Sequence, residues 1–416
     1  MLYLRSYNLI ISTQSGFRPH SHSAESILIK MTDDWLEEID QGLFTGEIFL
    51  DSRKAFDVVN HDLLVAKLQM YGYSSSALLW FKSYLSDRRQ CVNIAGTLSD
   101  TELLISGVLQ GSILSPVLFL LVINDLPLTW TNRNGLFVDD ATFYASASTL
   151  TYVQVQLQRD LSITATWTKD HGMAAHPQKT NYMIIGSRQK LSRCEESALS
   201  LCLDGGQLEQ TQRLLGLDID SSLYLGHHTK LILGKNSESA LLFWLVLKNS
   251  HRLTVASFYL MLVLNLFLST VSPFGEIVMQ DYWMRFLKFK KVVCVLYPAT
   301  IFGTWVATHQ SICIERILLM LKKILYGHAP DFLSEKLLSL KYHKSHDRRS
   351  RLPYRLPIPR TNSMKRMFFY NAVKLWNNVS ENVLVRSSDV KKFKRNFLDS
   401  DMCKFTPDSF KIDRIV

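Results

Sequence analysis

The spacing of apolar residues along the N-terminal half of the chain predicts an alternation of helices and strands. In some segments apolar side chains recur every three to four residues, which is the period of a helix with one buried face. Shorter apolar runs lie between these segments and are typical of strands. The predicted helices span residues 23–42, 61–72, 77–88, 115–127 and 150–172, and the predicted strands span residues 47–51, 90–96 and 179–187.

One apolar and aromatic run, "LFVDDATFY" at residues 136–144, is interrupted by the adjacent Asp139 and Asp140. Aspartate is a poor strand former, and a buried carboxylate without a partner costs several kcal/mol. We therefore place the two aspartates at the tip of a hairpin between two short strands. The resulting order of elements predicts an α+β domain in which helices and sheet pack in layers.

The C-terminal half is richer in predicted helix. Residues 254–271 form an apolar run about long enough to cross a bilayer, but Asn265 interrupts it. A buried core helix is the preferred interpretation, and a membrane protein anchored by this run is the alternative. The prolines of residues 351–360 predict an extended linker ahead of a last, basic helical piece.

Composition and charge narrow the class of protein. A content of 47% hydrophobic and 20% charged residues is that of a globular protein, not a disordered one. Residues 341–416 contain 18 Lys and Arg against 7 Asp and Glu, whereas residues 1–340 contain 29 against 30. This basic stretch indicates either a polyanionic partner or a solvated extension. Six scattered cysteines without a CxxC pair argue against a disulfide framework or a zinc site and fit a reducing compartment.

Asp51 ends the predicted strand at residues 47–51. If that strand neighbours the hairpin, Asp51, Asp139 and Asp140 converge at one end of a sheet and repel unless protons or cations intervene. Their hard oxygen ligands favour Mg²⁺ or Mn²⁺, and a two-metal site can stabilise both the attacking and the leaving oxygen of a phosphoryl displacement. Nucleotidyl transfer is thus the chemistry to test, although aspartate pairs at turns are mostly structural.

Six sequence blocks cover roughly residues 14–225: "QSGFRPHSHSAES", "FLDSRKAFDVVNH", "GVLQGSILSPVLFLLVINDLP", "FVDDATFYAS", "PQKTNYMIIGS" and "RLLGLDIDSSL". In these blocks and in their order the sequence resembles the reverse transcriptases of non-LTR (LINE-type) retrotransposons. The resemblance implies an RNA-directed DNA polymerase that uses two Mg²⁺ or Mn²⁺ ions, an RNA template, a DNA primer and deoxynucleoside triphosphates.

The same resemblance implies a right-hand polymerase palm with partial fingers, followed by a mostly helical thumb and C-terminal region. The compartment stays open from the sequence; the resemblance is compatible with an intracellular protein and names the nucleus as the candidate compartment. No stable membrane association is expected. The expected division is partial fingers at residues 1–46, palm with interleaved fingers at 47–225, helical thumb or connection at 226–345, and a basic extension at 346–416.

Carried over residue by residue, the resemblance makes Asp51, Asp139 and Asp140 the metal-binding aspartates of the palm. Lys179 matches a lysine near the leaving pyrophosphate, where an ammonium group can neutralise charge or donate a proton. Arg18 matches a fingers residue near the triphosphate.

Three further residues match the nucleotide-binding region of the family. Phe56 stands where an aromatic ring blocks a ribose 2′-OH; without the resemblance, a core phenylalanine would be the preferred interpretation. Gln110 and Gly111 match the loop that packs against the template-side base and the incoming nucleotide, and glycine permits close approach of the main chain.

The sequence also departs from the family pattern. Leu109 replaces the usual proline before Gln110, and Val138 replaces the usual alanine before the aspartate pair. Residues 171–180, "HGMAAHPQKT", replace an Asn-Gly-Leu…Asn pattern. The chain begins at the fingers, so we expect an N-terminally truncated copy that lacks upstream fingers strands and an endonuclease. The alternative function is a catalytically inactive, nucleic-acid-binding remnant.

Overall fold

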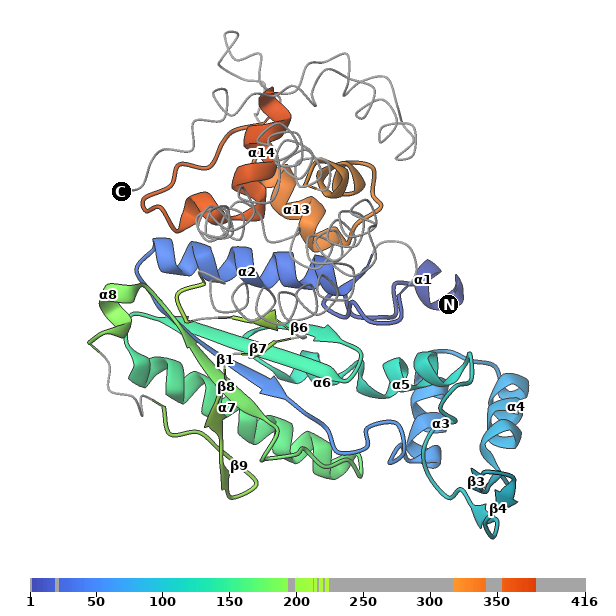
Figure 1. Cartoon of the computed structure of the whole chain (residues 1–416). Helices are drawn as coiled ribbons and strands as arrows, with labels where there is room; N and C mark the ends of the chain where they lie inside the picture. Colours follow the sequence, from blue (N-terminus) through green and yellow to red (C-terminus); the bar gives the residue numbers. More distant parts are fainter. Residues whose placement is uncertain are drawn as a thin grey trace, which may run out of the picture. The chain divides into compact units, whose positions relative to one another are not determined.

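A computed structural model describes residues 2–18, 22–193, 199–211, 213–214, 217–219, 221–223, 317–341 and 354–378 (Figure 1). The chain divides into two compact units, which are described separately. The first contains Met1–Ile27 and Gly42–Thr211, and the second contains Leu28–Gln41 and Gln212–Val416.

The first unit is built on a five-stranded sheet with the strand order β11-β8-β1-β7-β6. All neighbours are antiparallel except β11, which runs parallel to β8. The predicted strand near residues 47–51, the hairpin and the strand at 179–187 are therefore confirmed. The strands are β1 (Phe44–Leu50), β6 (Arg133–Phe137), β7 (Asp140–Ala147), β8 (Asn181–Ile185) and β11 (Glu209–Gln210).

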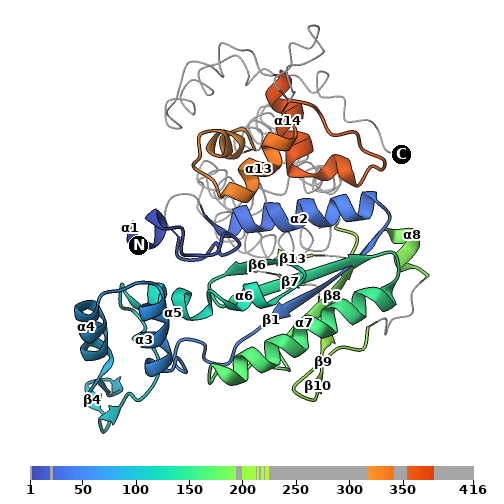
Figure 2. The same ribbon diagram turned by 180° about the vertical axis from the view of Figure 1, so that it is seen from behind.

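Helix α7 (Leu150–Asp170) covers one face of this sheet (Figures 1 and 2). The helix approaches β1 closely at Gly46, where a Cβ atom would lie 2.4 Å from Val153 Cγ1 and 2.7 Å from Leu157 Cδ1. Because these distances are too short for any side chain, glycine at this position lets the predicted helix pack directly on the central strand.

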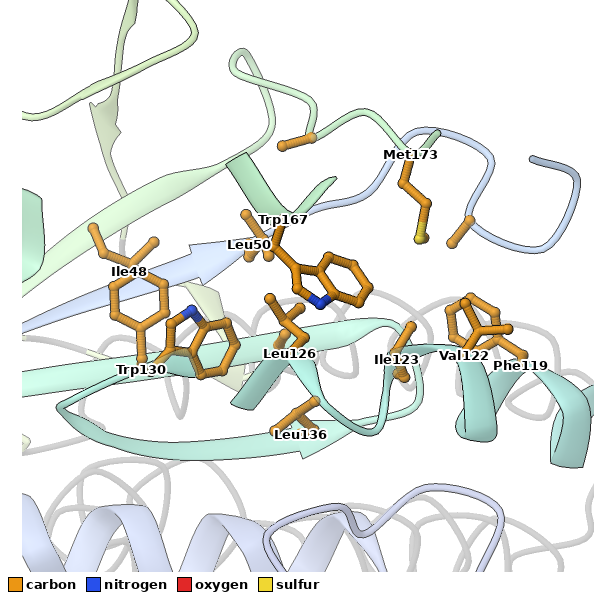
Figure 3. Close-up of a cluster of buried hydrophobic side chains, with 14 of the residues drawn as sticks. Ile48, Leu50, Phe119, Val122, Ile123, Leu126, Trp130, Leu136, Trp167 and Met173 are labelled. Atoms are coloured by element: carbon orange, nitrogen blue, oxygen red, sulfur yellow. The ribbon is translucent and has the colours of Figure 1, made fainter. Parts of the chain in front are cut away.

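A hydrophobic core joins the α7 face of the sheet to α5 (Ser115–Ile123) and α6 (Leu126–Thr129). The Trp130 indole is buried in this core, and its N–H donates to Thr164 Oγ1 of α7 at 2.8 Å. The polar group of this large core side chain is thereby satisfied. Figure 3 shows the cluster, with Ile48, Leu50, Phe119, Val122, Ile123, Leu126, Trp130, Leu136, Trp167 and Met173 labelled.

Helices α3 (His61–Met70) and α4 (Ser75–Leu85) confirm the predicted helices at 61–72 and 77–88, and each begins at a side-chain cap. Asn60 Oδ1 accepts from the Leu63 N–H at 2.9 Å, and Ser74 Oγ accepts from the Ala77 N–H at 3.4 Å. Such caps satisfy main-chain donors that have no partner inside the helix. The shorter helices are α1 (Leu2–Ser6) and α8 (Arg188–Leu191).

The predicted strand at residues 90–96 is wrong. The segment splits into β2 (Arg89–Gln90), which pairs with β5 (Glu102–Leu103), and β3 (Asn93–Ile94), which pairs with β4 (Thr97–Leu98). The chain reverses at Ala95 and Gly96, whose φ angles are +50° and +89°. Positive φ at both central residues is the pattern of a tight hairpin turn.

The predicted helix at 115–127 is too long. Helix α5 ends at Ile123, and Pro127 lies in the first turn of the separate helix α6. Proline is tolerated there because the first main-chain N–H groups of a helix have no partner within it. Two small ladders complete the described sheet structure: β9 (Cys202–Leu203) with β10 (Gly206–Gln207), and β12 (Arg213–Leu214) with β13 (Leu217–Asp218).

The second unit contains most of α2 (Ala24–Asp40), which confirms the predicted helix at 23–42. Its other described helices are residues 317–325, α13 (Asp331–Ser339), the 3-10 helix η2 (Met364–Arg366) and α14 (Phe368–Asn378). The buried Asp33 accepts from the N–H groups of Phe368 and Phe369 at 2.7 and 3.0 Å and so caps α14. Lys336 forms ion pairs with Asp34 and Glu37 at 3.1 and 3.3 Å.

Residues 254–271 lie outside the described residues, so the choice between a core helix and a membrane span stays a prediction. Among the residues that are described, no helix is both long and apolar enough to cross a membrane. Residues 354–360 carry no helix, and Tyr354 forms an isolated bridge with Lys341. The linker role expected for residues 351–360 stays a prediction.

We expect Asp160→Ala to lower the free energy of unfolding by about 1–3 kcal/mol, because it removes a buried carboxylate that accepts several hydrogen bonds from partly buried donors. The Asp160 carboxylate is fully buried and accepts from the main-chain N–H groups of Thr131 and Asn132 at 3.2 and 3.0 Å, just before β6. Urea denaturation measures the change. Ser162→Ala, on an exposed position of the same helix, is the control, and equal losses in the two variants would contradict this account.

Candidate active site

Strand pairing brings the ends of β1, β7 and β8 together. Leu50 pairs with Ala141 of β7, so the next residues along the two strands are Asp51 and Asp140. On the other side of β1, Phe49 pairs with Asn181, the first residue of β8. The register therefore directs Asp51 and the start of β7 to one end of the sheet, so the condition on which the three aspartates could converge is met.

The hairpin between β6 and β7 has a two-residue turn. Phe137 pairs with Asp140, which leaves Val138 and Asp139 as the turn residues. The prediction that the aspartates lie at a hairpin tip is thus confirmed, with Asp139 in the turn and Asp140 as the first residue of β7.

Val138 has a φ of +63°, and Asp139 does not share this positive value. Positive φ at the first turn residue is the pattern of a type II′ hairpin turn, where glycine is usual. A β-branched side chain in this region costs on the order of 1–3 kcal/mol. The residue that replaces the family's usual alanine therefore lies in the turn itself and not in either strand.

The carboxylates at this end of the sheet act on one another. Partial burial and, after it, the negative charges of Asp139 and Asp51 raise the pKa of Asp140 to about 6. The repulsion expected among these carboxylates thus favours the protonated form of Asp140. Asp139 and Asp140 remain exposed as residues, and Asp51 is half-buried, so the site is open to solvent.

This donor set suits a hard divalent cation. Mg²⁺ takes oxygen ligands and uses one or two carboxylates together with water and substrate phosphates. Asp51, Asp139 and Asp140 supply such oxygens, and their mutual repulsion is what a bound cation would relieve. Within the described ranges, however, no group of three His, Cys, Asp or Glu side chains is gathered tightly enough to hold a metal ion.

The main chain on both sides of Asp51 is held by residues 174–180. The Asp51 N–H donates to Thr180 Oγ1 at 3.2 Å, and the His176 N–H donates to the Asp51 carbonyl at 2.8 Å. The "HGMAAHPQKT" stretch, which departs from the family pattern, therefore supplies these contacts to Asp51. Lys179, which precedes the buried Thr180, is exposed at the same end of the sheet.

Phe56, Gln110 and Gly111 come from two loops that pack on each other. The half-buried Phe56 ring stacks on the buried Phe119 ring, with centroids 4.3 Å apart and planes 20° apart. Gln110 Nε2 donates to Asp57 Oδ1 at 2.8 Å, which links the loop after β1 to the loop before α5. Gly111 has a φ of +84°, a main-chain conformation that favours glycine.

Arg18 lies in the N-terminal segment between α1 and α2. Its guanidinium donates to the Ile11 and Gln14 carbonyl oxygens at 3.0 and 3.3 Å. The nearby Gln14 hydrogen-bonds to the main chain of Val138, a role that the sequence pattern did not predict. The available signal was its position as the first residue of the "QSGFRP" block.

A protein-family model described as reverse transcriptase (RNA-dependent DNA polymerase) matches residues 1–229, more than half of the chain. The chain belongs to the reverse transcriptase family. The matched range contains Asp51, the Asp139–Asp140 hairpin and Lys179. The resemblance to the reverse transcriptases of non-LTR retrotransposons is thereby confirmed.

Similar proteins come from mobile elements of insects. The chain is 30% identical over 227 residues to the probable RNA-directed DNA polymerase from transposon BS of Drosophila melanogaster, covering 52% of this chain and 24% of that protein. It is 24% identical over 244 residues to the RNA-directed DNA polymerase from mobile element jockey of the same species, covering 56% and 26%.

A third relative is the retrovirus-related Pol polyprotein from type-1 retrotransposable element R2 of Popillia japonica, at 26% identity over 187 residues, which covers 42% of this chain and 31% of that protein. The chain thus spans about a quarter to a third of the length of these three relatives. Among solved structures, the Candida albicans telomerase in complex with a telomeric RNA fragment matches at a TM-score of 0.36 and 14% identity, covering 75% of this chain and 50% of that one. A likeness at that level carries no argument.

We expect Mg²⁺ to raise the melting temperature at pH 7.5 and to have much less effect at pH 5. The pKa of Asp140 is raised to about 6 in the folded chain from the usual aspartate value of 3.8, so the native state binds more protons than the unfolded chain between these values. Folding stability without cations therefore falls as pH rises through this window. Thermal unfolding in EDTA and in Mg²⁺ measures both effects.

Under the same conditions, Asp140→Asn should raise the melting temperature in EDTA at pH 7.5 and should remove most of the response to Mg²⁺. Asp100→Asn, at an exposed loop position, is the matched control and should leave both unchanged. A lower melting temperature of Asp140→Asn in EDTA at pH 7.5 would contradict the repulsion account.

Proposed function

We propose that this chain provides the polymerase domain of a non-LTR retrotransposon, an RNA-directed DNA polymerase that extends a DNA primer on an RNA template with deoxynucleoside triphosphates. The observation that carries the proposal is the β1–β7 register, which leads Asp51 to the Asp139–Asp140 hairpin in a chain of the reverse transcriptase family. The names of its relatives, RNA-directed DNA polymerases of mobile elements, support the same activity.

In this proposal the sheet with α7 is the palm of a right-hand polymerase. Residues 1–46 contribute partial fingers, 47–225 the palm with interleaved fingers, 226–345 a helical thumb or connection, and 346–416 a basic extension that contacts nucleic acid. The excess of Lys and Arg in residues 341–416 supports the last assignment. The expected compartment is the nucleus, where a DNA primer would be found.

Asp51, Asp139 and Asp140 are the residues that would hold two Mg²⁺ ions. When bound, the ions stabilise charge on the attacking and leaving oxygens of the phosphoryl group. Lys179, exposed at the same end of the sheet, would place an ammonium group near the leaving pyrophosphate and neutralise its charge or donate a proton.

The remaining candidates would select and hold the nucleotide. Phe56 is supported from behind by the stacked ring of Phe119, so it cannot easily move aside for a ribose 2′-OH. Gln110 and Gly111 would face the base pair, with Gln110 oriented by its hydrogen bond to Asp57. Arg18, whose guanidinium donates to the Ile11 and Gln14 carbonyl oxygens, would supply positive charge to the triphosphate.

The first test is primer extension on an RNA template with Mg²⁺. We expect Asp139→Ala to reduce incorporation to background, because the exposed turn carboxylate is a proposed metal ligand, while the variant stays folded at the assay temperature. Asp100→Asn is again the control. Full incorporation by Asp139→Ala would refute the assignment, and template binding without incorporation by the parent chain would favour the nucleic-acid-binding remnant.

The second test concerns sugar selection. We expect Phe56→Ala to increase the use of ribonucleotides relative to deoxynucleotides by about 10- to 100-fold, since a steric contact of a few carbon atoms is worth about that much. Phe56→Tyr, which keeps the ring, should retain the selectivity of the parent chain. The measurement is single-nucleotide incorporation with each sugar. If Phe56→Ala discriminates between the two sugars as well as the parent chain does, the Phe56 ring does not select the sugar and only packs against Phe119.

A further inference from the structure

The side chain of Gln14 bridges the two polar main-chain groups of Val138. Its Nε2 donates to the Val138 carbonyl oxygen at 3.1 Å, and its Oε1 accepts from the Val138 N–H at 3.0 Å. Oε1 also accepts from the Gly16 N–H at 2.7 Å. Two N–H donors face one end of the carboxamide and a carbonyl faces the other, so all its contacts agree with one orientation. The residue is only 2% exposed.

Val138 is the turn residue whose conformation most needs support. It has a positive φ and a β-branched side chain, and it lies immediately before the Asp139–Asp140 pair. The ladder between β6 and β7 closes at Phe137 and Asp140, so it does not pair the N–H and carbonyl groups of Val138. The carboxamide of Gln14 supplies both of the missing hydrogen bonds.

Gln14 is itself held firmly against β6, which is the last strand in the sheet order. The Ser15 N–H donates to the Leu136 carbonyl at 2.8 Å, and the Leu136 N–H donates to the Thr13 carbonyl at 3.0 Å. Just upstream, Asn124 accepts from the Ile11 N–H at 2.8 Å. The bridging side chain therefore projects from a segment with its own main-chain attachments.

Gly16 lets this segment approach the turn. A Cβ atom at Gly16 would lie 2.3 Å from Val138 N and 2.4 Å from Val138 Cγ2. Any other residue would push the turn away from the Gln14 carboxamide. The turn before the aspartates is therefore packed directly against the segment that contains Gln14 and Gly16.

We propose that Gln14 is a positioning residue: by fixing the main chain of Val138 it determines where Asp139 and Asp140 stand, and thereby tunes the affinity of the site for divalent cations. The inference rests on the proposed function, since it takes these aspartates to be metal ligands. Gln14 reaches the ligands only through the turn and does not contact the reacting groups. Residues that orient metal ligands in this indirect way typically change metal affinity by about 10- to 100-fold when they are replaced.

The test compares the full chain with Gln14→Met, which has nearly the same shape but can form none of these hydrogen bonds. Gln158 offers a matched control, because its carboxamide donates to the Cys202 carbonyl and accepts from the Cys202 N–H, both at 2.9 Å. Gln158→Met thus breaks an equivalent two-bond bridge at β9. Mn²⁺ binding is followed by electron paramagnetic resonance without substrates, and the Mg²⁺ dependence of primer extension is measured separately.

We expect Gln14→Met to weaken Mn²⁺ binding by about tenfold or more and to raise the Mg²⁺ concentration for half-maximal incorporation to a similar extent. Gln158→Met should change neither. Adding Val138→Gly to Gln14→Met should recover much of the Mn²⁺ affinity, because glycine adopts the turn without the bridge. Because the Mn²⁺ affinity is measured on folded protein, a role of Gln14 in overall stability alone would leave the affinity unchanged in both Gln14→Met and the double variant.

Unchanged Mn²⁺ affinity in a folded Gln14→Met chain would overturn the positioning role while leaving the proposed function standing. If Gln14→Met does not fold, Gln14→Asn, one methylene shorter, carries the same expectation and the same contrary outcome. If the parent chain neither binds Mn²⁺ nor incorporates nucleotides, the proposed function fails, and the positioning role fails with it.

Discussion

The position of β1 between β7 and β8 is the constraint on which the candidate site depends. Strand β1 pairs with β7 up to Leu50 and with β8 up to Phe49, so Asp51 lies at the hairpin end of β7. Because side chains alternate between the two faces of a sheet, a shift of one residue would turn Asp51 to the opposite face. Gly46 strengthens the register, since only a residue without a side chain fits under α7 at that point.

Charge repulsion and main-chain strain at the site raise the free energy of the folded chain, and contacts elsewhere in the structure must compensate for them. Asp139 and Asp51 repel Asp140, and Val138 adopts a φ that β-branched residues avoid. Such strain persists only where neighbouring contacts over-determine the conformation, and it is typical of functional sites. Here the contacts come from the buried core beneath the sheet and from the bridge that Gln14 forms to the turn.

The local sequence pattern was sufficient to predict those helices and turns that a few neighbouring residues determine. The helical period predicted α3 and α7, and the poor strand propensity of aspartate located the hairpin tip at Asp139. The strand expected at 90–96 failed because alternation alone does not reveal the reversal at Ala95 and Gly96. Asp51 lies beside the hairpin because of a long-range strand pairing, which the period of apolar residues does not encode. The family resemblance, and not the spacing, made this placement an expectation.

The contact between Gln14 and Val138 joins residues 124 positions apart, and no local pattern points to it. It also changes the meaning of the departure at Val138. Valine at this position is not simply extra volume beside the aspartates, because its Cγ2 occupies the space where Gly16 has no side chain, and its main chain is bound by Gln14. The "QSG" residues and the valine before the aspartate pair are thus mutually dependent. A larger residue at position 16 would displace a turn that Gln14 holds at positive φ, and with it the carboxylates of Asp139 and Asp140.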